Sequence, residues 1–204
     1  MRLIGSHTSP YVRKARLVLL EKGIAHDYLV DPPSDPNSAV YRVNPLGRIP
    51  ALILDSDECV YDSVVICEYA DTLSDTPVLI PRHDALARMR VKRWEALADG
   101  IMDSAIVVRN EELRPPATQL AATLLLHNDA ISRTLEHVSA QLGPREWCED
   151  DQLSLGDLAL VAALAYLDLR QPQRNWRHTH PNLAEFFARM QARPAVALSL
   201  ADNK

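Results

Sequence analysis

The feature that most constrains this chain is a change of periodicity about 80 residues from its start. Residues 1–81 alternate short apolar runs with helical patterns and hold eight of the fourteen prolines, which is typical of βαβ construction. Beyond them, the apolar residues recur almost wholly at helical spacing. We therefore predict an α/β part followed by an all-α part. They join across residues 72–82, where two prolines and several turn formers interrupt both periodicities.

The expected elements follow from these periodicities and from the glycines and prolines between them. In the first part, strands are predicted at residues 2–6, 26–30, 51–54 and 58–61, and helices at 10–23 and 64–73. The last two strands flank an Asp-Ser-Asp turn, as in a β-hairpin. In the second part, helices are predicted at residues 85–113, 118–142, 155–168 and 182–191 and after Pro194. Ser154 and Asp157 match a capping box, which stabilises a helix start, rather than a pair of catalytic acids.

Size and charge limit the classes of partner. A chain of 204 residues buries enough apolar surface to fold without disulfide staples. Its net charge of −5, with basic and acidic residues interspersed, provides no footprint for nucleic acid or an anionic membrane. The longest apolar run, residues 158–167, is about half as long as a bilayer-spanning helix, and the first fourteen residues lack the apolar stretch of a secretory signal. We therefore expect a cytoplasmic protein.

Neither a metal site nor a disulfide framework is expected. The three cysteines are an odd number without CxxC spacing, and each lies in or beside an apolar segment: Cys59, Cys67 and Cys148. Reduced thiols with a structural role fit this pattern. His178 and His180 lie close together but lack further spaced ligands, so they are interpreted as surface residues.

Three segments place polar groups at a strand end or a helix start, and the first contains Ser9. This residue follows a predicted strand and precedes Pro10, which is the pattern of an N-cap with proline at the first helical position. The same geometry directs a hydroxyl and unpaired backbone N–H groups toward an anion such as a thiolate, at the positive end of the helix dipole. Taken alone, the segment favours a plain cap.

The other two segments offer groups that suit an amino acid or a peptide. Pro50 stands at a strand entrance, so a cis Ile49–Pro50 bond is one alternative to an ordinary trans proline in a loop. If the bond is cis, Ile49 presents its backbone N–H and C=O to an extended peptide. At the next helix start, Ser63 suits a carboxylate and Asp62 suits an ammonium group, although both also fit a standard cap. Together the three segments suit a small, extended, zwitterionic peptide.

Three motifs in order along the chain resemble those of the cytosolic glutathione S-transferase superfamily. SPYVRKARLVLLEKGI is similar to the family's first catalytic loop and helix, NPLGRIPAL to its cis-proline loop, and YDSVVICEYAD to its γ-glutamyl-binding turn. LSLGDLALVAALAYLDLR and HPNLAEFFARMQARPAV resemble helices of the family's second domain. The resemblance covers essentially the whole chain and looks closest to small bacterial members with a serine-type active site.

The resemblance implies a thioredoxin-like βαβαββα domain at residues 1–78, which binds glutathione, and an all-helical domain at residues 86–204. It implies that Ser9 is catalytic and donates a hydrogen bond to the glutathione sulfur, with Thr8 as a competing hydroxyl. It also implies that the other portions of glutathione are bound by Arg48, Ile49, Pro50, Asp62 and Ser63. The implied reaction is attack of the glutathione thiolate on a small electrophilic or hydrophobic substrate, in detoxification. The alternatives are a glutathione-dependent isomerase, dehalogenase or peroxidase, or a noncatalytic glutathione-binding module.

Further expectations concern the second substrate and the subunits. Candidates for a second-substrate pocket are Tyr11, Ile106, Arg109 and Tyr166, although core packing of Tyr166 and a dimer contact or salt bridge of Arg109 fit the sequence equally well. The resemblance implies a homodimer in which the first domain of each subunit packs against the helical domain of the other. Glutathione is then a co-substrate, and no metal is involved. A basic cluster is interpreted as the solvated face of the first helix rather than as a binding patch: Arg13, Lys14 and Arg16. The edge of the site is the alternative place for Arg13.

Overall fold

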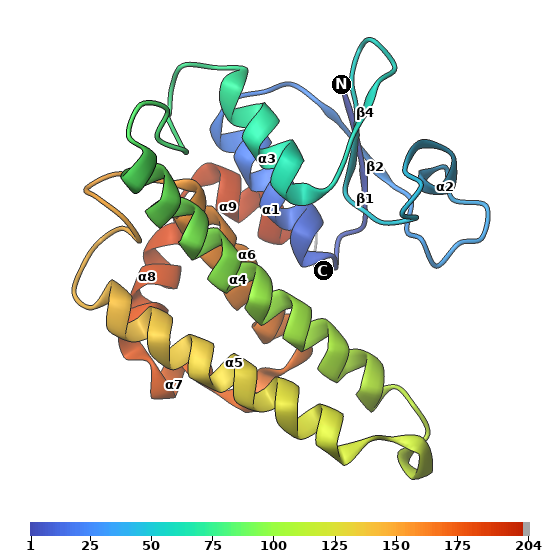
Figure 1. Ribbon diagram of the computed structural model, residues 1–204, viewed down its shortest axis with the longest axis vertical. Coiled ribbons are helices and arrows are strands. Elements are labelled where there is room, and N and C mark those ends of the chain that lie inside the picture. The colour runs from blue at the N-terminus through green and yellow to red at the C-terminus, as the bar shows by residue number, and fades with distance from the viewer. Residues whose placement is uncertain (202–204) are drawn as a thin grey trace.

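The computed structural model describes residues 1–201 and contains two parts of different construction (Figure 1). The first part comprises β1 (Arg2–Gly5), α1 (Pro10–Glu21), β2 (Asp27–Val30), α2 (Val40–Val43), β3 (Ala51–Ile53), β4 (Cys59–Val60) and α3 (Ser63–Thr72). The second part comprises α4 (Ala85–Glu112), α5 (Ala121–Leu142), α6 (Leu155–Arg170), α7 (Trp176–Thr179), α8 (Pro181–Gln191) and α9 (Pro194–Ala201). The predicted fold, a thioredoxin-like α/β domain followed by an all-helical domain, is confirmed.

The sheet of the first part is mixed and has the strand order β2-β1-β3-β4. β1 pairs with β2 in parallel and with β3 antiparallel, and β3 pairs with β4 antiparallel across the predicted hairpin turn. Because side chains alternate across a strand, Leu3 and Leu52 belong to the main core with α1 and α3. Ile4 and Ala51 form a separate small cluster with Val40 of α2. Helices therefore cover both faces of the sheet, with α2 on the side away from α1 and α3 (Figure 1).

α1 carries the first candidate site residue and begins where the sequence predicts. Ser9 caps the helix: its Oγ accepts a hydrogen bond from the Val12 N–H at 3.4 Å, and Pro10 stands in the first turn. The helix ends just before Gly23, whose φ of +66° lies in the left-handed region that favours glycine and closes helix ends. α1 packs against α3 of the first part and α6 of the second, so it lies at the boundary between the parts.

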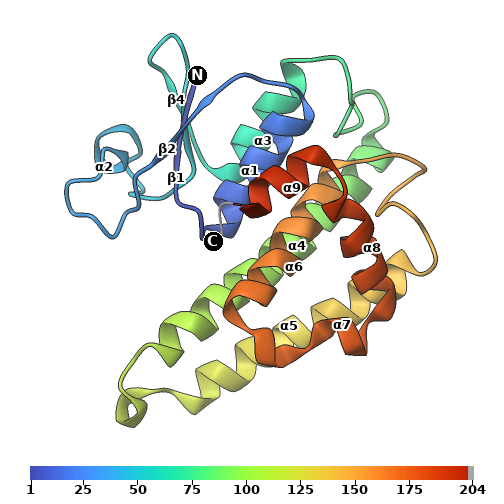
Figure 2. The same ribbon diagram turned by 180° about the vertical axis from the view of Figure 1, so that it is seen from behind.

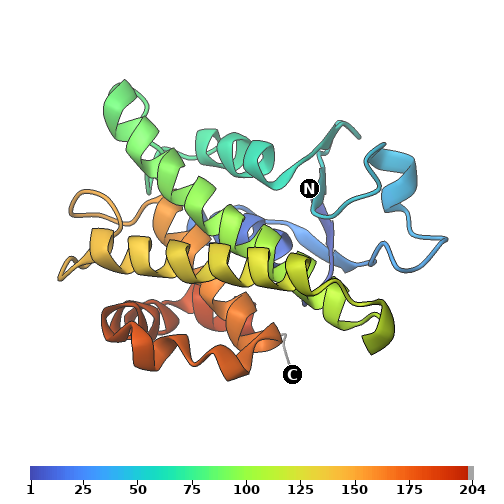
Figure 3. The same cartoon turned by 60° about the horizontal axis from the view of Figure 1, so that its bottom comes forward.

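α4 and α6 form the centre of the helical part. α4 packs against both α5 and α6, and α6 is buried along most of its length. Figure 3 shows α4 and α5 running side by side, and Figure 2 shows α9 returning beside α1. No helix within residues 1–201 is both long and apolar enough to cross a membrane.

Most elements lie where the sequence predicts, and the differences have local causes. The periodicities do not predict the short helices α2 and α7, because four residues make about one turn; only the βαβαββα order implied by the resemblance includes a helix at the place of α2. α5 begins at Ala121 instead of residue 118, because a 3₁₀ turn over Pro116–Thr118 precedes it. α6 continues to Arg170, two residues beyond the predicted end.

The predicted capping box at the start of α6 is present. The buried Asp157 carboxylate accepts hydrogen bonds from the backbone N–H and the hydroxyl of Ser154, at 2.8 and 2.7 Å. It also accepts the backbone N–H of Cys148 at 2.8 Å, which fastens the preceding loop. These bonds satisfy donors that would otherwise be buried without partners, so the pair serves the fold.

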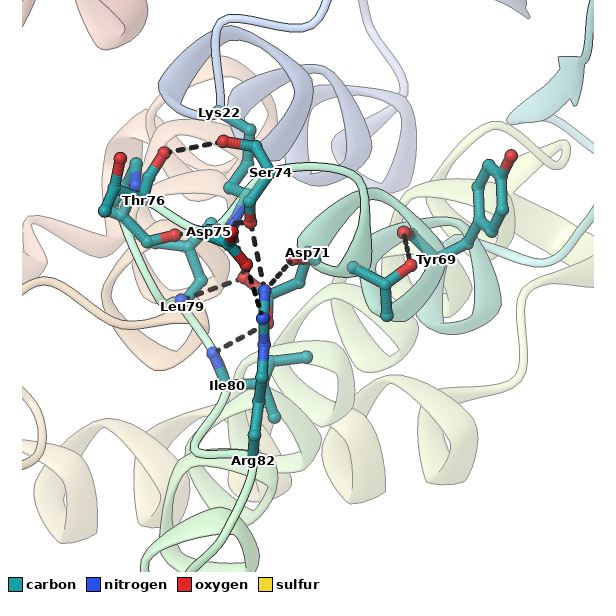
Figure 4. Close-up of polar contacts among 11 residues, drawn as sticks. Lys22, Tyr69, Asp71, Ser74, Asp75, Thr76, Leu79, Ile80 and Arg82 are labelled. Carbon is teal, nitrogen blue, oxygen red and sulfur yellow. Dashed lines mark hydrogen bonds and ion pairs between the residues drawn. The ribbon is translucent and has the colours of Figure 1, made fainter.

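The segment between α3 and α4 is held by a buried ion pair (Figure 4). Lys22 Nζ, after the end of α1, lies 3.1 Å from Asp71 Oδ1 of α3 and donates to the carbonyls of Ser74 and Pro77, both at 2.6 Å. The other partner, Asp71, accepts the backbone N–H of Leu79 at 2.9 Å. These bonds fix Ser74, Pro77 and Leu79 to the end of α1 and to α3.

The prediction that the basic cluster of α1 is a solvated face is wrong for two of its residues. Arg13 and Lys14 are buried. Lys14 Nζ lies 2.9 Å from Glu95 Oε1 and 2.8 Å from both carboxylate oxygens of Asp99, on α4. The sequence pattern identifies a charged residue on a helix, but it does not reveal that a distant helix brings carboxylates to it. Lys14 therefore joins α1 to α4.

Candidate active site

A cleft of about 1100 Å³ lies between the first part and the helical part. Its walls come from the loop after β1, the start of α1, the loop before β3, the start of α3, and the helices α4 and α6. All eleven residues that the sequence analysis assigns to the site line it: Thr8, Ser9, Tyr11, Arg48, Ile49, Pro50, Asp62, Ser63, Ile106, Arg109 and Tyr166. The fold thus brings residues that are far apart in the sequence to one place.

Ser9 and Thr8 both line the cleft but differ in their bonding. Because Ser9 Oγ accepts the Val12 N–H, the hydroxyl proton stays available to donate to a ligand. Thr8 is exposed and lies one residue before the cap. The unpaired N–H groups in the first turn of α1 and the helix dipole both favour negative charge beside Ser9. An anion at this point is stabilised by the hydroxyl and by the helix.

The loop before β3 presents Ile49 and Pro50 to the cleft, and their peptide bond is cis, which was one of the predicted alternatives. The buried Asn44 shapes this loop: its side chain donates to the Arg48 carbonyl at 2.8 Å and accepts the Leu46 N–H at 3.0 Å. Within the described residues, the backbone N–H of Ile49 has no hydrogen-bond partner. The loop therefore leaves a backbone donor for a ligand in the cleft.

Asp62 and Ser63 stand at the start of α3. Asp62 caps this helix and accepts the Val64 N–H at 3.0 Å, while Ser63 is the first helical residue and is almost wholly buried. A carboxylate can accept more than one hydrogen bond, so the cap leaves Asp62 able to accept a ligand donor as well. The start of α3 thus combines an acceptor with a helix N-terminus that favours a ligand carboxylate.

The α4 wall adds two carboxylates that the sequence did not single out, Asp99 and Asp103. Asp103 accepts a hydrogen bond from the Tyr11 hydroxyl, and burial together with this bond raises the pKa of Tyr11. Asp99 pairs with Lys14, but burial raises the pKa of its carboxyl overall. Both carboxylates therefore have donors from α1, and these contacts join the two parts at the cleft.

Helical spacing is the sequence signal that could have identified the missed residues. Asp99, Asp103 and Asn110 recur at helical spacing on one face of α4 and all line the cleft. Arg170 also lines the cleft and lies four residues after Tyr166 on α6. A search for polar residues one turn from each candidate would have found them.

The described residues offer little for metal or thiol chemistry in the cleft. Within residues 1–201, no three His, Cys, Asp or Glu side chains are grouped so that they could hold a metal ion. The cysteines are free thiols; Cys67 and Cys148 are buried, and burial raises the pKa of Cys67 to about 12. The groups that face the cleft are hydroxyls, backbone N–H groups, arginines and carboxylates.

Both parts of the chain match known proteins. The models of the glutathione S-transferase N-terminal and C-terminal domains match residues 8–73 and 85–189. GST-like protein YibF of Escherichia coli (strain K12) is 36% identical over 197 residues, which cover 97% of this chain and 96% of the relative. A crystal structure of a glutathione S-transferase from Methylobacillus flagellatus, with glutathione bound, has 40% identity and a TM-score of 0.94, and the match covers 97% of this chain and 98% of that one.

A further solved relative holds a modified glutathione. It is a glutathione transferase family member from Pseudomonas fluorescens Pf-5 with bound S-(propanoic acid)-glutathione, at 35% identity and a TM-score of 0.83, and the match covers 98% of each chain. The matches extend over both parts of the chain and agree with the order of its motifs. The chain therefore belongs to the glutathione S-transferase family.

Proposed function

We propose that the protein is a glutathione transferase of the serine type, which binds glutathione in the cleft and stabilises its sulfur as a thiolate. The observation that carries this proposal is the position of Ser9, which caps α1 at the cleft with its hydroxyl proton available to donate. The relative with bound glutathione supports glutathione as the co-substrate.

In this proposal, each portion of glutathione meets complementary groups of the first part. The backbone of Ile49, before Pro50, pairs with the cysteinyl portion of the extended peptide. Asp62 accepts from the γ-glutamyl ammonium group, and Ser63 with the start of α3 binds the γ-glutamyl carboxylate. Arg48, which lines the same cleft, binds the glycyl carboxylate.

The catalytic contribution is a lower pKa of the bound thiol. A free thiol has a pKa of about 8.5 and is mostly protonated at neutral pH, whereas the thiolate is the nucleophile. The Ser9 hydroxyl and the helix dipole both favour the charged form of the sulfur. The thiolate then forms a bond to an electrophilic carbon of the second substrate, and the leaving group departs with its bonding electrons. Ser9 stays uncharged throughout, so this step needs no general base.

The proposal also covers the second substrate, the subunits and the location. A small electrophile binds in the part of the cleft lined by Tyr11, Ile106, Arg109 and Tyr166. The Pseudomonas fluorescens relative holds a glutathione whose sulfur carries a propanoic acid group, which supports a place for a substituent beside the sulfur in this family. We propose a cytoplasmic homodimer that acts in detoxification, with domains at residues 1–78 and 86–204. Sedimentation at micromolar concentration should give twice the chain mass of 22.8 kDa.

The ultraviolet absorbance of the thiolate, followed against pH in the glutathione complex, tests the role of Ser9. In the wild-type complex, the pKa of the bound glutathione thiol should be lower than the pKa of the same thiol in water. Ser9→Ala removes one charge-assisted hydrogen bond, worth roughly 1.5–3 kcal/mol, so the pKa of the bound thiol should rise by about one to two units. The affinity for glutathione should change less, because the groups assigned to its other portions do not contact the sulfur.

Thr8→Ala is the matched control, because it removes a hydroxyl that lines the cleft without capping α1. A shift in Thr8→Ala without one in Ser9→Ala would move the catalytic role to Thr8. The same titration in all three proteins would indicate a noncatalytic glutathione-binding module. A panel of electrophiles assayed with glutathione then separates transferase activity from isomerase, dehalogenase or peroxidase activity.

A further inference from the structure

The wall of the cleft formed by α4 and α6 carries two arginines without an ionic partner. Arg109 of α4 and Arg170 of α6 both line the cleft. Within residues 1–201 neither forms an ion pair with a carboxylate, and Arg109 makes only a long contact of 3.4 Å to the neighbouring Asn110 side chain. The Nε of Arg170 is enclosed and has no hydrogen-bond partner among these residues. Two guanidinium groups on one wall are thus available to a ligand.

The carboxylates that line the cleft do not form ion pairs with these arginines, because they are engaged elsewhere. Both oxygens of Asp99 lie 2.8 Å from Lys14 Nζ. Asp103 accepts the hydroxyl of Tyr11, and Asp62 caps α3. A half-buried cation without a partner is unfavourable, and an anionic ligand would relieve this cost.

These arginines also lie apart from the groups proposed to hold glutathione. Those groups belong to the first part, where Arg48 serves the glycyl carboxylate. Arg109 and Arg170 belong to the helical part, and the guanidinium carbon of Arg170 lies 6.0 Å from the ring centroid of Tyr166. Burial raises the pKa of Tyr166 although Arg109 and Arg170, which donates a hydrogen bond to its hydroxyl, act to lower it; the hydroxyl therefore stays protonated and its proton can be donated beside the two cations.

We propose that the second substrate carries a carboxylate, which Arg109 and Arg170 bind while the glutathione sulfur attacks the electrophilic carbon. Guanidinium groups bind carboxylates through paired N–H donors, and such charge-assisted hydrogen bonds are stronger than neutral ones. This inference rests on the proposed function, because it places glutathione in the rest of the cleft. A site of this kind binds an electrophile that carries a carboxylate more tightly than a neutral electrophile of equal size.

Two glutathione conjugates of equal size test the inference without requiring turnover. S-(4-carboxybenzyl)glutathione and S-(4-carbamoylbenzyl)glutathione differ in the charge of one group, and calorimetric titration gives the Kd of each and of glutathione itself. The wild-type protein should bind the carboxy conjugate about tenfold more tightly than the carbamoyl conjugate, which one charge-assisted hydrogen bond can supply. Arg109→Gln and Arg170→Gln should each reduce this ratio to near one by weakening the binding of the carboxy conjugate alone.

Arg133→Gln is the matched control, because Arg133 is exposed on α5 and outside the cleft, so the same charge is removed elsewhere. It should keep the tenfold preference. Arg170 also lies in the last turn of α6, where a cation stabilises the helix dipole. Arg170→Lys keeps this charge but lacks the paired N–H donors, so it should keep only part of the preference, and thermal unfolding of each variant verifies that it is folded.

The possible results separate this inference from the proposed function. If the wild-type protein binds glutathione but binds the two conjugates equally, the carboxylate inference is overturned and the proposed function stands. If it does not bind glutathione, both are overturned. A preference that survives in both Gln variants would also overturn the inference, because it would assign the carboxylate to residues other than Arg109 and Arg170.

Discussion

At the start of α1, two hydroxyl groups face the cleft with opposite hydrogen-bond roles. The Tyr11 hydroxyl donates to Asp103 of α4, so its proton is engaged between the two parts of the chain. The Ser9 hydroxyl accepts from the backbone, and its proton has no acceptor within residues 1–201. Burial, with Asp103 nearby, raises the pKa of Tyr11 and keeps the phenol protonated over the ordinary pH range. Of the two residues, Ser9 is therefore the one suited to donate to a sulfur atom.

We predict that Tyr11→Phe leaves the pKa of the bound glutathione thiol unchanged. It should lower the free energy of unfolding by about 0.5–1.5 kcal/mol, which is typical of one intramolecular hydrogen bond. Thiolate absorbance against pH measures the first quantity, and urea unfolding measures the second. A thiol pKa that rises in Tyr11→Phe as much as in Ser9→Ala would show that the phenol contacts the sulfur.

At the residue scale, local patterns indicate the helix caps of the first part that line the cleft, whereas on the helices the candidates Ile106, Arg109 and Tyr166 were named but Asp99, Asp103 and Arg170 were not. Ser9 and Asp62 are helix caps, so a few neighbouring residues indicate their positions. Asp99 enters the cleft because α4 packs against α1, and its ionic partner is 85 residues away in the sequence. The same long-range packing explains why the prediction for Lys14 is wrong. Arg170 was missed although it lies one turn after the candidate Tyr166 on the same face of α6.

At the element scale, the segment between α3 and α4 depends on Lys22 and Asp71, both buried. Its prolines, Pro77 and Pro81, predict the interruption of periodicity, but they do not predict that the segment is fixed. That depends on an ion pair between residues 49 positions apart, which no local pattern reveals. The connection is therefore part of the packed structure, as Figure 4 shows.

We predict that Lys22→Met lowers the free energy of unfolding by about 3–5 kcal/mol, because it leaves the Asp71 carboxylate buried without its cation. The double variant Lys22→Met/Asp71→Asn should lose less than the sum of the two single losses, because residues in contact couple. Urea unfolding of the wild type, both single variants and the double variant measures this coupling. Losses that simply add would mean that the pair does not act as a unit.

At the scale of the whole molecule, apolar and ionic contacts join the two parts. The main core includes residues of both, such as Leu17 of α1 and Leu160 of α6. Lys14 pairs with carboxylates of α4, and Glu21 forms a two-point ion pair with Arg193, next to α9, at 2.8 and 2.7 Å. Because the main core is shared by the two parts and only a small cluster under α2 lies outside it, we expect them to unfold together.

Two probes that lie in different parts can test this expectation. All three tryptophans lie in the second part, so their fluorescence reports on that part alone: Trp94, Trp147 and Trp176. Cys67 of α3 reports on the first part, because its thiol is buried and burial raises its pKa to about 12. Such a thiol resists alkylation until the surrounding structure opens.

We predict that tryptophan fluorescence and pulsed alkylation of Cys67, resolved by peptide mass spectrometry, give the same urea midpoint at one protein concentration. Lys14→Met should lower both midpoints together, because at the boundary of the two parts it leaves the Asp99 carboxylate without its cation and leaves Glu95 paired with Lys92 alone. Alkylation of Cys67 at lower urea than the fluorescence change would contradict this. The first part would then open alone, and the cleft between the parts would be lost before the helical part unfolds.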